Sequence, residues 1–224
     1  MSAMKVFGGA AAFALALTVW GGPACADDVA PPQSPAELTK ALAEVGKPGP
    51  EHAKLGPLAG CWAYTGKFWL DPNKTPSEIS GTIERHWILG GRFLQEKFAG
   101  TGLDGKPGWE GFGLIGYDNG RKNFTGTWAC TMGTGMKLGS GVADATGQAF
   151  TFRTEAYCPL RKKVVEGREV IRIESNDKVV FECYETTDGK ETKMMELISQ
   201  RTKCPESVAR QTNENPATPA TRRE

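Results

Sequence analysis

The chain has 224 residues, a length typical of one domain, and its 27 Lys and Arg residues nearly balance its 26 Asp and Glu residues. This balance argues against nucleic acid or an anionic membrane as the main partner. Only two histidines are present, and no two cysteines have C-x-x-C spacing, which argues against a zinc site or a thioredoxin-type redox centre. We therefore expect no metal and no cofactor.

The first 26 residues have the parts of a secretory signal peptide. Lys5 is the only charged residue before Asp27, an apolar run covers residues 6–20, and Ala24-Cys25-Ala26 matches an A-x-A cleavage site. A membrane anchor is disfavoured because the run is short, and a lipoprotein because no aliphatic residue precedes Cys25 at the usual position. Cleavage after Ala26 would leave a mature chain whose net charge is zero, because only Lys5 is lost. We expect a periplasmic or secreted protein without stable membrane insertion.

Residues 27–50 predict a flexible arm that carries one short helix. In "SPAELTKALAEVG", Ser34 is a candidate N-cap, Pro35 takes the first helical position and Glu37 completes a capping box. Gly46 is a stop signal, so the helix should cover about residues 35–45. At the other end, residues 205–224 contain almost no apolar side chains and predict a disordered tail.

Residues 51–204 predict a β-barrel domain. Short alternating runs of apolar and polar residues are divided by Gly and Asn/Asp turn pairs, which is typical of an antiparallel meander. Closure would hide both sheet edges, so we expect an all-β fold: a closed antiparallel up-and-down β-barrel of about ten strands, preceded by a short N-terminal helix. The expected strands are 60–69, 79–89, 92–99, 109–117, 121–131, 134–143, 148–158, 167–175, 179–187 and 190–202.

A turn at Gly90-Gly91 fixes the register of one long hairpin. A two-residue turn sets Arg85 opposite Glu96, whereas a three-residue loop would set Glu84 against Glu96, a like-charge pair that costs stability. We therefore predict an interior face with an ion pair among apolar side chains, formed by Ile83, Arg85, Trp87, Leu94, Glu96 and Phe98.

Asn119-Gly120 and Asp188-Gly189 predict two further hairpins, because both dipeptides accept positive φ. The second turn sets Phe181 opposite Glu196 and Cys183 opposite Met194. With a loop at residues 176–178, it also pairs Arg172 with Glu182 outside the barrel. The predicted interior face then contains Ile171, Ile173, Val179, Phe181, Cys183, Met194, Glu196 and Ile198.

Arg201 conflicts with this face. Pairing of the first and last strands would bring Arg201 to Trp62, in a cation–π contact at the barrel base. However, Arg201 has the opposite parity to Glu196 along its strand. A β-bulge near residues 199–200 would reconcile the two assignments. Without such a bulge, one of the two assignments is wrong. The two hairpins favour the assignment that places residues 194–198 inside the barrel.

Several motifs, in order, resemble the bacterial family named domain of unknown function 1579. They are "EHAKLGPLAGCW", "RHWILGGRFLQEKFAG", "GFGLIGYDNGRKNFTGTW", "MGTGM" and "MMELISQR", which together span about residues 51–203. The resemblance implies a calycin-like barrel related to lipocalins, and it implies no activity or catalytic residues. One departure is Cys130, which stands where the family usually has an acidic residue after the strand Trp.

The hairpins predict the cysteine pairing in an oxidising compartment. In a closed even-numbered meander, the start of the first strand meets the end of the last, which brings Cys61 to Cys204. The turn near residues 143–147 brings Cys158 towards Cys130, so we predict a second disulfide between them. Cys183 is left as a buried free thiol.

Arg85 and Glu96 are the first candidates for a ligand site, although a purely structural ion pair is the simpler interpretation. Glu196 could act as an acid, a base or a polar anchor, or could pair with an arginine. His86 is expected at the surface, and His52 could cap the barrel base.

We predict an exported barrel that binds a small, partly apolar molecule. An enzyme with an interior glutamate, or a structural envelope or stress protein with a filled barrel, is the alternative. The predicted ligand-binding residues are Arg85, Trp87, Leu94, Glu96, Phe98, Phe181, Met194 and Glu196.

Overall fold

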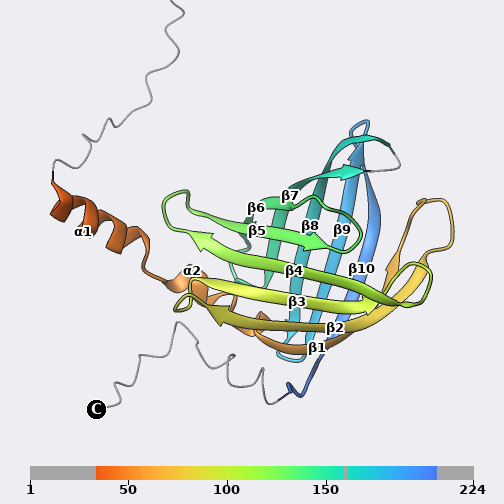
Figure 1. Ribbon diagram of the computed structural model, residues 1–224, viewed down its shortest axis with the longest axis horizontal. Helices are drawn as coiled ribbons and strands as arrows, with labels where there is room; N and C mark the ends of the chain where they lie inside the picture. Colours follow the sequence, from red (N-terminus) through yellow and green to blue (C-terminus); the bar gives the residue numbers. More distant parts are fainter. Residues whose placement is uncertain (1–33, 159–160, 206–224) are drawn as a thin grey trace, which may run out of the picture.

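The computed structural model describes residues 34–158 and 161–205, where ten antiparallel strands close into a barrel (Figure 1). Each strand pairs with its neighbours in sequence, and β1 pairs with β10. The predicted fold class is thus confirmed, whereas the signal peptide and nearly all of the C-terminal tail lie outside the described residues. The strands are β1 (Gly60–Phe68), β2 (Ser77–Ile88), β3 (Phe93–Thr101), β4 (Pro107–Asp118), β5 (Asn123–Cys130), β6 (Lys137–Ala143), β7 (Ala149–Cys158), β8 (Lys163–Ser175), β9 (Lys178–Thr187) and β10 (Lys190–Thr202).

The β2–β3 hairpin has the predicted register. Arg85 lies opposite Glu96, and the ladder closes at Ile88 opposite Phe93. Gly90 and Gly91 have φ of 65° and 79°, values that glycine adopts without strain. Because side chains alternate between the two faces of a strand, this register places the Arg85–Glu96 pair inside the barrel.

The β9–β10 hairpin starts in the predicted register and then changes. Thr187 pairs with Lys190 around the Asp188-Gly189 turn, but the ladder shifts by one residue between Lys193 and Met195. This β-bulge reverses the side-chain parity of the rest of β10. The prediction that Met194 and Glu196 face inward is therefore wrong, and so is the bulge position near residues 199–200. The side chains that line the interior are those of Met195, Leu197 and Ser199.

Two short helices, α2 (Pro50–Ala53) and η1 (Gly56–Leu58), lie at one end of the barrel, which we call the base (Figure 1). Leu55 and Leu58 are fully buried there. His52 is 3% exposed, its Nδ1 accepts a hydrogen bond from the Gly49 N–H at 3.1 Å, and its ring meets the Tyr117 ring edge-on. Burial lowers the pKa of His52. These contacts agree with a capping position at the base.

Arg201 completes the base. Its guanidinium stacks on the Trp62 ring, 4.1 Å from the ring centroid, as the pairing of the first and last strands predicts. The same group donates hydrogen bonds to the backbone carbonyls of Pro57, Ala59 and Asn176. Arg201 thus links the η1 segment, β1 and the β8–β9 loop. The contact resolves the parity conflict in favour of Arg201 and against the inward placement of residues 194, 196 and 198.

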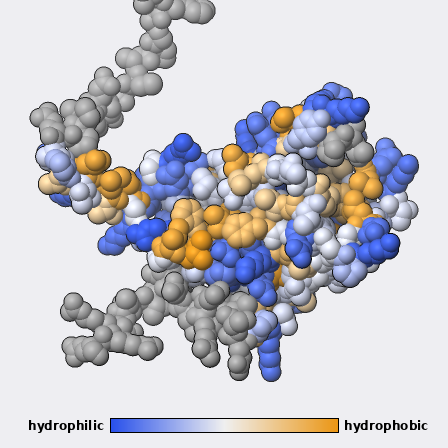
Figure 2. Space-filling view, in the orientation of Figure 1, coloured by the Kyte–Doolittle hydropathy of each residue, from blue (hydrophilic) through white to orange (hydrophobic). Residues whose placement is uncertain are grey.

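Helix α1 (Pro35–Val45) projects away from the barrel (Figure 1). It begins as predicted, with the Glu37 N–H donating to Ser34 Oγ at 3.2 Å, and it ends at Gly46. None of its residues is buried. The Asn119 side chain donates to the carbonyls of Val45 and Lys47, which ties the end of α1 to the β4–β5 turn. Figure 2 shows apolar surface on α1 and on the barrel beside it. Within the described residues, no helix has the length and apolar character needed to cross a membrane.

Candidate ligand-binding cavity

A cavity of about 110 Å³ lies inside the barrel. All strands from β2 to β10 contribute to its wall. Much of this wall is apolar and aromatic, and its five aromatic rings also pack with other rings or against the core. Prominent members of the wall are Phe98, Trp109, Trp128, Phe152, Phe181 and Met195.

Glycines on three neighbouring strands belong to the cavity wall. Gly113, Gly126 and Gly139 belong to β4, β5 and β6, and all three line the cavity. A Cβ added at Gly126 would meet no atom closer than 3.8 Å, whereas one at Gly113 would come within 2.9 Å of the Thr127 carbonyl oxygen. A Cβ at Gly126 would thus make only ordinary van der Waals contacts with the Leu114 carbonyl and the Phe152 ring, while Gly113 permits close packing.

Arg85 and Glu96 form the ion pair that the hairpin register predicts. Arg85 Nε donates to Glu96 Oε2 at 2.5 Å, and only 6% and 14% of the two side chains are exposed. Arg85 Nη1 is buried and has no hydrogen-bond partner among the described residues. Both side chains line the cavity. The pair thus presents a donor and an acceptor at an otherwise largely apolar wall.

A second ion pair, between Lys137 Nζ and Glu169 Oε1, also lines the cavity and was not predicted from the sequence. Burial lowers the pKa of Lys137, but the adjacent Glu169 carboxylate outweighs burial and raises this pKa overall. Glu169 was accessible to sequence reasoning, because it lies two residues from Ile171, which the hairpins place inside. Lys137 was not, because no strong turn dipeptide sets the β5–β6 register.

The eight predicted ligand-binding residues fall into three groups. Four of them line the cavity: Arg85, Glu96, Phe98 and Phe181. Trp87 and Leu94 lie opposite each other and are 2% and 1% exposed, but they belong to the packed core and not to the cavity wall. Met194 and Glu196 lie outside the cavity wall. Ligand contact by the first group stays a prediction.

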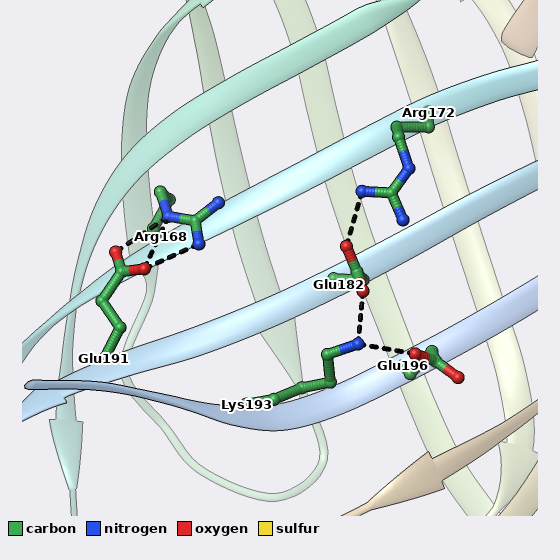
Figure 3. Close-up of polar contacts among 6 residues, drawn as sticks. All are labelled: Arg168, Arg172, Glu182, Glu191, Lys193 and Glu196. Atoms are coloured by element: carbon green, nitrogen blue, oxygen red, sulfur yellow. Dashed lines mark hydrogen bonds and ion pairs between the residues drawn. The ribbon is translucent and has the colours of Figure 1, made fainter.

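Glu196 belongs to a network of charges on the outer faces of β8, β9 and β10 (Figure 3). Lys193 lies between Glu182 and Glu196, and Glu182 also accepts a hydrogen bond from Arg172 at 2.6 Å. The predicted Arg172–Glu182 pair is thus present. Burial raises the pKa of Glu182, but hydrogen bonds from Arg172 and Lys193 outweigh burial and bring this pKa to about 2. Glu196 is therefore a paired surface carboxylate and no interior acid or base.

The cysteines follow one of the two predicted pairings. Cys61 and Cys204 form a disulfide with their Cα atoms 5.2 Å apart. Cys130 and Cys158 do not pair and are free thiols. They lie at the ends of β5 and β7, with β6 between these strands in the sheet order, and two strand spacings are about 9.5 Å, beyond the reach of a disulfide.

Cys183 is a free thiol, as predicted, and lies opposite Met195 and beside Glu169 in the sheet. Burial raises the pKa of Cys183 to about 12, and the Glu169 carboxylate adds to this rise. The group is therefore a protonated thiol at neutral pH, which makes it a poor nucleophile.

Neither histidine contributes to the cavity wall. His86 lies on the opposite face of β2 from Arg85, as predicted, yet it is only 6% exposed, so its expected surface exposure is wrong. Across the described ranges, no three His, Cys, Asp or Glu side chains are grouped in a way that could hold a metal ion.

A family model described as "Protein of unknown function (DUF1579)" matches residues 47–201. The chain belongs to the DUF1579 family. The match contains every cavity-lining residue as well as the Arg201 contact at the base. The cavity is thus part of the DUF1579 domain itself. No curated protein matches the chain.

Three solved structures illustrate what the DUF1579 chain is similar to. A redesigned β-barrel has 15% identity and a TM-score of 0.35, covering 67% of this chain and 96% of its own. EF1p2_mFAP2b bound to DFHBI has 13% identity and a TM-score of 0.36, with coverage of 68% and 99%. The S-type phycobiliprotein lyase CPES from Guillardia theta has 11% identity and a TM-score of 0.43, with coverage of 70% and 100%. Such scores are too low to carry an inference about function.

Proposed function

We propose that this protein is exported and binds a small, partly apolar, uncharged molecule inside its barrel. The observation that carries the proposal is the interior cavity, in which a largely apolar wall is interrupted by one largely buried and one partly buried ion pair. Concave sites with mostly apolar walls and a few placed polar groups are the usual form of small-molecule sites.

The charge of the cavity wall favours an uncharged ligand. Arg85 pairs with Glu96 and Lys137 pairs with Glu169, so the wall carries two positive and two negative groups that already neutralise each other. A charged ligand would enter without a free counter-ion, and an unpaired buried charge is costly. Neutral hydroxyl, carbonyl or amide groups avoid this cost.

The cavity volume limits the size of the ligand. An engineered protein cavity of about 150 Å³ holds benzene, and this cavity measures about 110 Å³. This volume therefore favours a ligand with a single ring, and substituents on the ring require movement of the wall. Met195 belongs to the wall, and a methionine side chain can change its shape to admit small substituents.

Two features support export. The first 26 residues match a secretory signal peptide in sequence. The Cys61–Cys204 disulfide is compatible with an oxidising compartment, where such bonds persist. Expression with the native N-terminus should give a periplasmic protein whose mature chain begins at Asp27. An intact N-terminus on protein recovered from the cytoplasm would refute this part of the proposal.

Native mass spectrometry of gently purified periplasmic protein tests the binding function directly. We expect an adduct of one small molecule, which is lost when the barrel is denatured. The Gly126→Leu variant should remove the adduct, because Gly126 lines the cavity and its backbone accepts a Cβ at ordinary contact distances, so the rest of the Leu side chain would occupy the cavity. Thr125→Leu is the matched control, since Thr125 neighbours Gly126 on β5 but points away from the cavity. Equal adducts on both variants would contradict binding in this cavity.

A further inference from the structure

We propose that the cavity has two hydrogen-bonding poles on opposite walls and takes an uncharged ring compound that carries a hydroxyl or amide group at each end. The first pole is the Arg85–Glu96 pair, and the second is the Lys137–Glu169 pair. This inference rests on the proposed function and specifies the chemical class of its ligand.

The order of strands around the barrel places the two pairs on opposing walls. Arg85 and Glu96 belong to β2 and β3, whereas Lys137 and Glu169 belong to β6 and β8. Around the closed ring, β6 lies three strands from β3 and β8 lies four strands from β2. Likewise β6 lies four strands from β2 and β8 lies five strands from β3, which is the largest separation that a ten-stranded ring allows. The two pairs therefore lie mostly across the barrel from each other.

Both poles also belong to one cross-strand row. Glu96 lies opposite Gly113, Gly113 opposite Trp128, and Trp128 opposite Lys137. The row therefore begins and ends with a charged group and has a glycine and an indole between them. A ligand that spans the cavity in front of this row, between the inward-pointing side chains of Glu96 and Lys137, would meet polar groups at its ends and an apolar surface at its middle.

Each pole offers both a donor and an acceptor. At the first pole, Arg85 donates and Glu96 accepts, and Arg85 Nη1 has no partner among the described residues although the side chain is only 6% exposed. Trp109 Nε1 is a second buried donor that finds no partner within the described part of the chain, and Trp109 lines the same cavity. Buried donors without partners carry a desolvation cost that a ligand oxygen would relieve.

The walls between the poles favour a flat ring. Phe98, Trp109 and Trp128 contribute three aromatic rings, with centroids 4.8 Å apart for Phe98–Trp109 and 5.6 Å apart for Phe98–Trp128. Their arrangement is edge-to-face, which leaves ring faces and edges for a further aromatic contact. A hydroxyl can both donate and accept, so it matches either pole.

Three compounds of nearly equal shape test the inference: p-xylene, p-cresol and hydroquinone. They carry none, one or two hydroxyl groups at the ends of the same ring. Dissociation constants would be measured by NMR titration of the exported protein under argon, which keeps hydroquinone reduced. We expect affinity to rise at each step and by at least about tenfold from p-xylene to hydroquinone, since each net hydrogen bond contributes modestly.

Paired substitutions identify the poles. Lys137→Met with Glu169→Gln should reduce hydroquinone binding to the level of p-cresol and leave p-xylene binding unchanged. Arg85→Met with Glu96→Gln should do the same independently, so a folding failure of one variant leaves the other informative. The matched control is Lys193→Met with Glu182→Gln, an ion pair on the outer face (Figure 3). It should leave all three affinities unchanged.

The outcomes separate this inference from the proposed function. Equal affinity for all three compounds overturns the two poles while leaving a binding cavity in place. A preference for hydroquinone that persists in both pole variants also overturns them. If none of the three compounds binds and purified protein carries no adduct, the proposed function itself fails.

Discussion

Removal of the Cys61–Cys204 disulfide should lower the free energy of unfolding by about 2–5 kcal/mol. The bond joins residues 143 positions apart. In the chain-entropy model, closing a loop of this length restricts the unfolded state by about 5 kcal/mol at 25 °C, and residual structure in the unfolded chain reduces this value. The β1–β10 ladder, from Cys61–Thr202 to Phe68–Met195, would still close the barrel.

The assay is urea unfolding of the Cys61→Ala/Cys204→Ala variant followed by circular dichroism. We expect a native-like spectrum, an earlier midpoint and a larger m-value, because the unfolded chain without the cross-link exposes more surface, with a thermal midpoint lower by about 5–15 °C. Cys158→Ala is the control, because Cys158 is a free thiol and its removal breaks no cross-link. A loss below about 0.5 kcal/mol for the double variant would refute the reasoning, since the strand ladder alone would then account for closure.

Two further predictions concern buried titrating groups. Glu182 has its pKa lowered to about 2 in the folded state, so the stability it contributes is complete above its unfolded value of 4.5 and is lost as pH falls towards 2. Glu182→Gln should therefore flatten the pH dependence of the unfolding free energy between pH 5 and 2, by roughly 1–2 kcal/mol because Arg172 and Lys193 are partly exposed; an unchanged slope would contradict this. Cys183, with a pKa of about 12, should react with iodoacetamide at pH 8 at least about a hundredfold more slowly in the native protein than in denaturant, as peptide mapping would reveal. Equal rates would show that the thiol is exposed.

The strands and the β2–β3 register were predictable because their determinants are local. Gly90 and Gly91 permit a turn that few other residues would, and the charges of Arg85 and Glu96 select one register over its neighbour. Once that register is set, strict alternation assigns every side chain on the hairpin to one face. Sequence reasoning alone was therefore enough to predict that Arg85 and Glu96 face the interior of the barrel.

The set of β10 side chains that faces inward could not be predicted in this way, because both alternating sets of residues along the strand include apolar side chains. Met194 and Ile198 would form one apolar face, and Met195 and Leu197 form the other. A single extra residue at the bulge between Lys193 and Met195 decides between them. Only the contact of Arg201 with Trp62, which depends on strands far apart in sequence, carries the information.

The two ion pairs inside the barrel are difficult to explain by stability alone. Replacing a buried ion pair by well-packed neutral side chains is often neutral or stabilising, by about 1–4 kcal/mol. Here both pairs border a cavity instead of filling it, and Arg85 retains a donor without a partner. If the pairs serve a ligand, the paired substitutions at Arg85 and Glu96, or at Lys137 and Glu169, should lose affinity while keeping or gaining stability. A loss of stability in both variants, with ligand affinity intact, would instead identify the pairs as links between strands. Binding and stability measured on the same variants therefore distinguish a site from a structural pair.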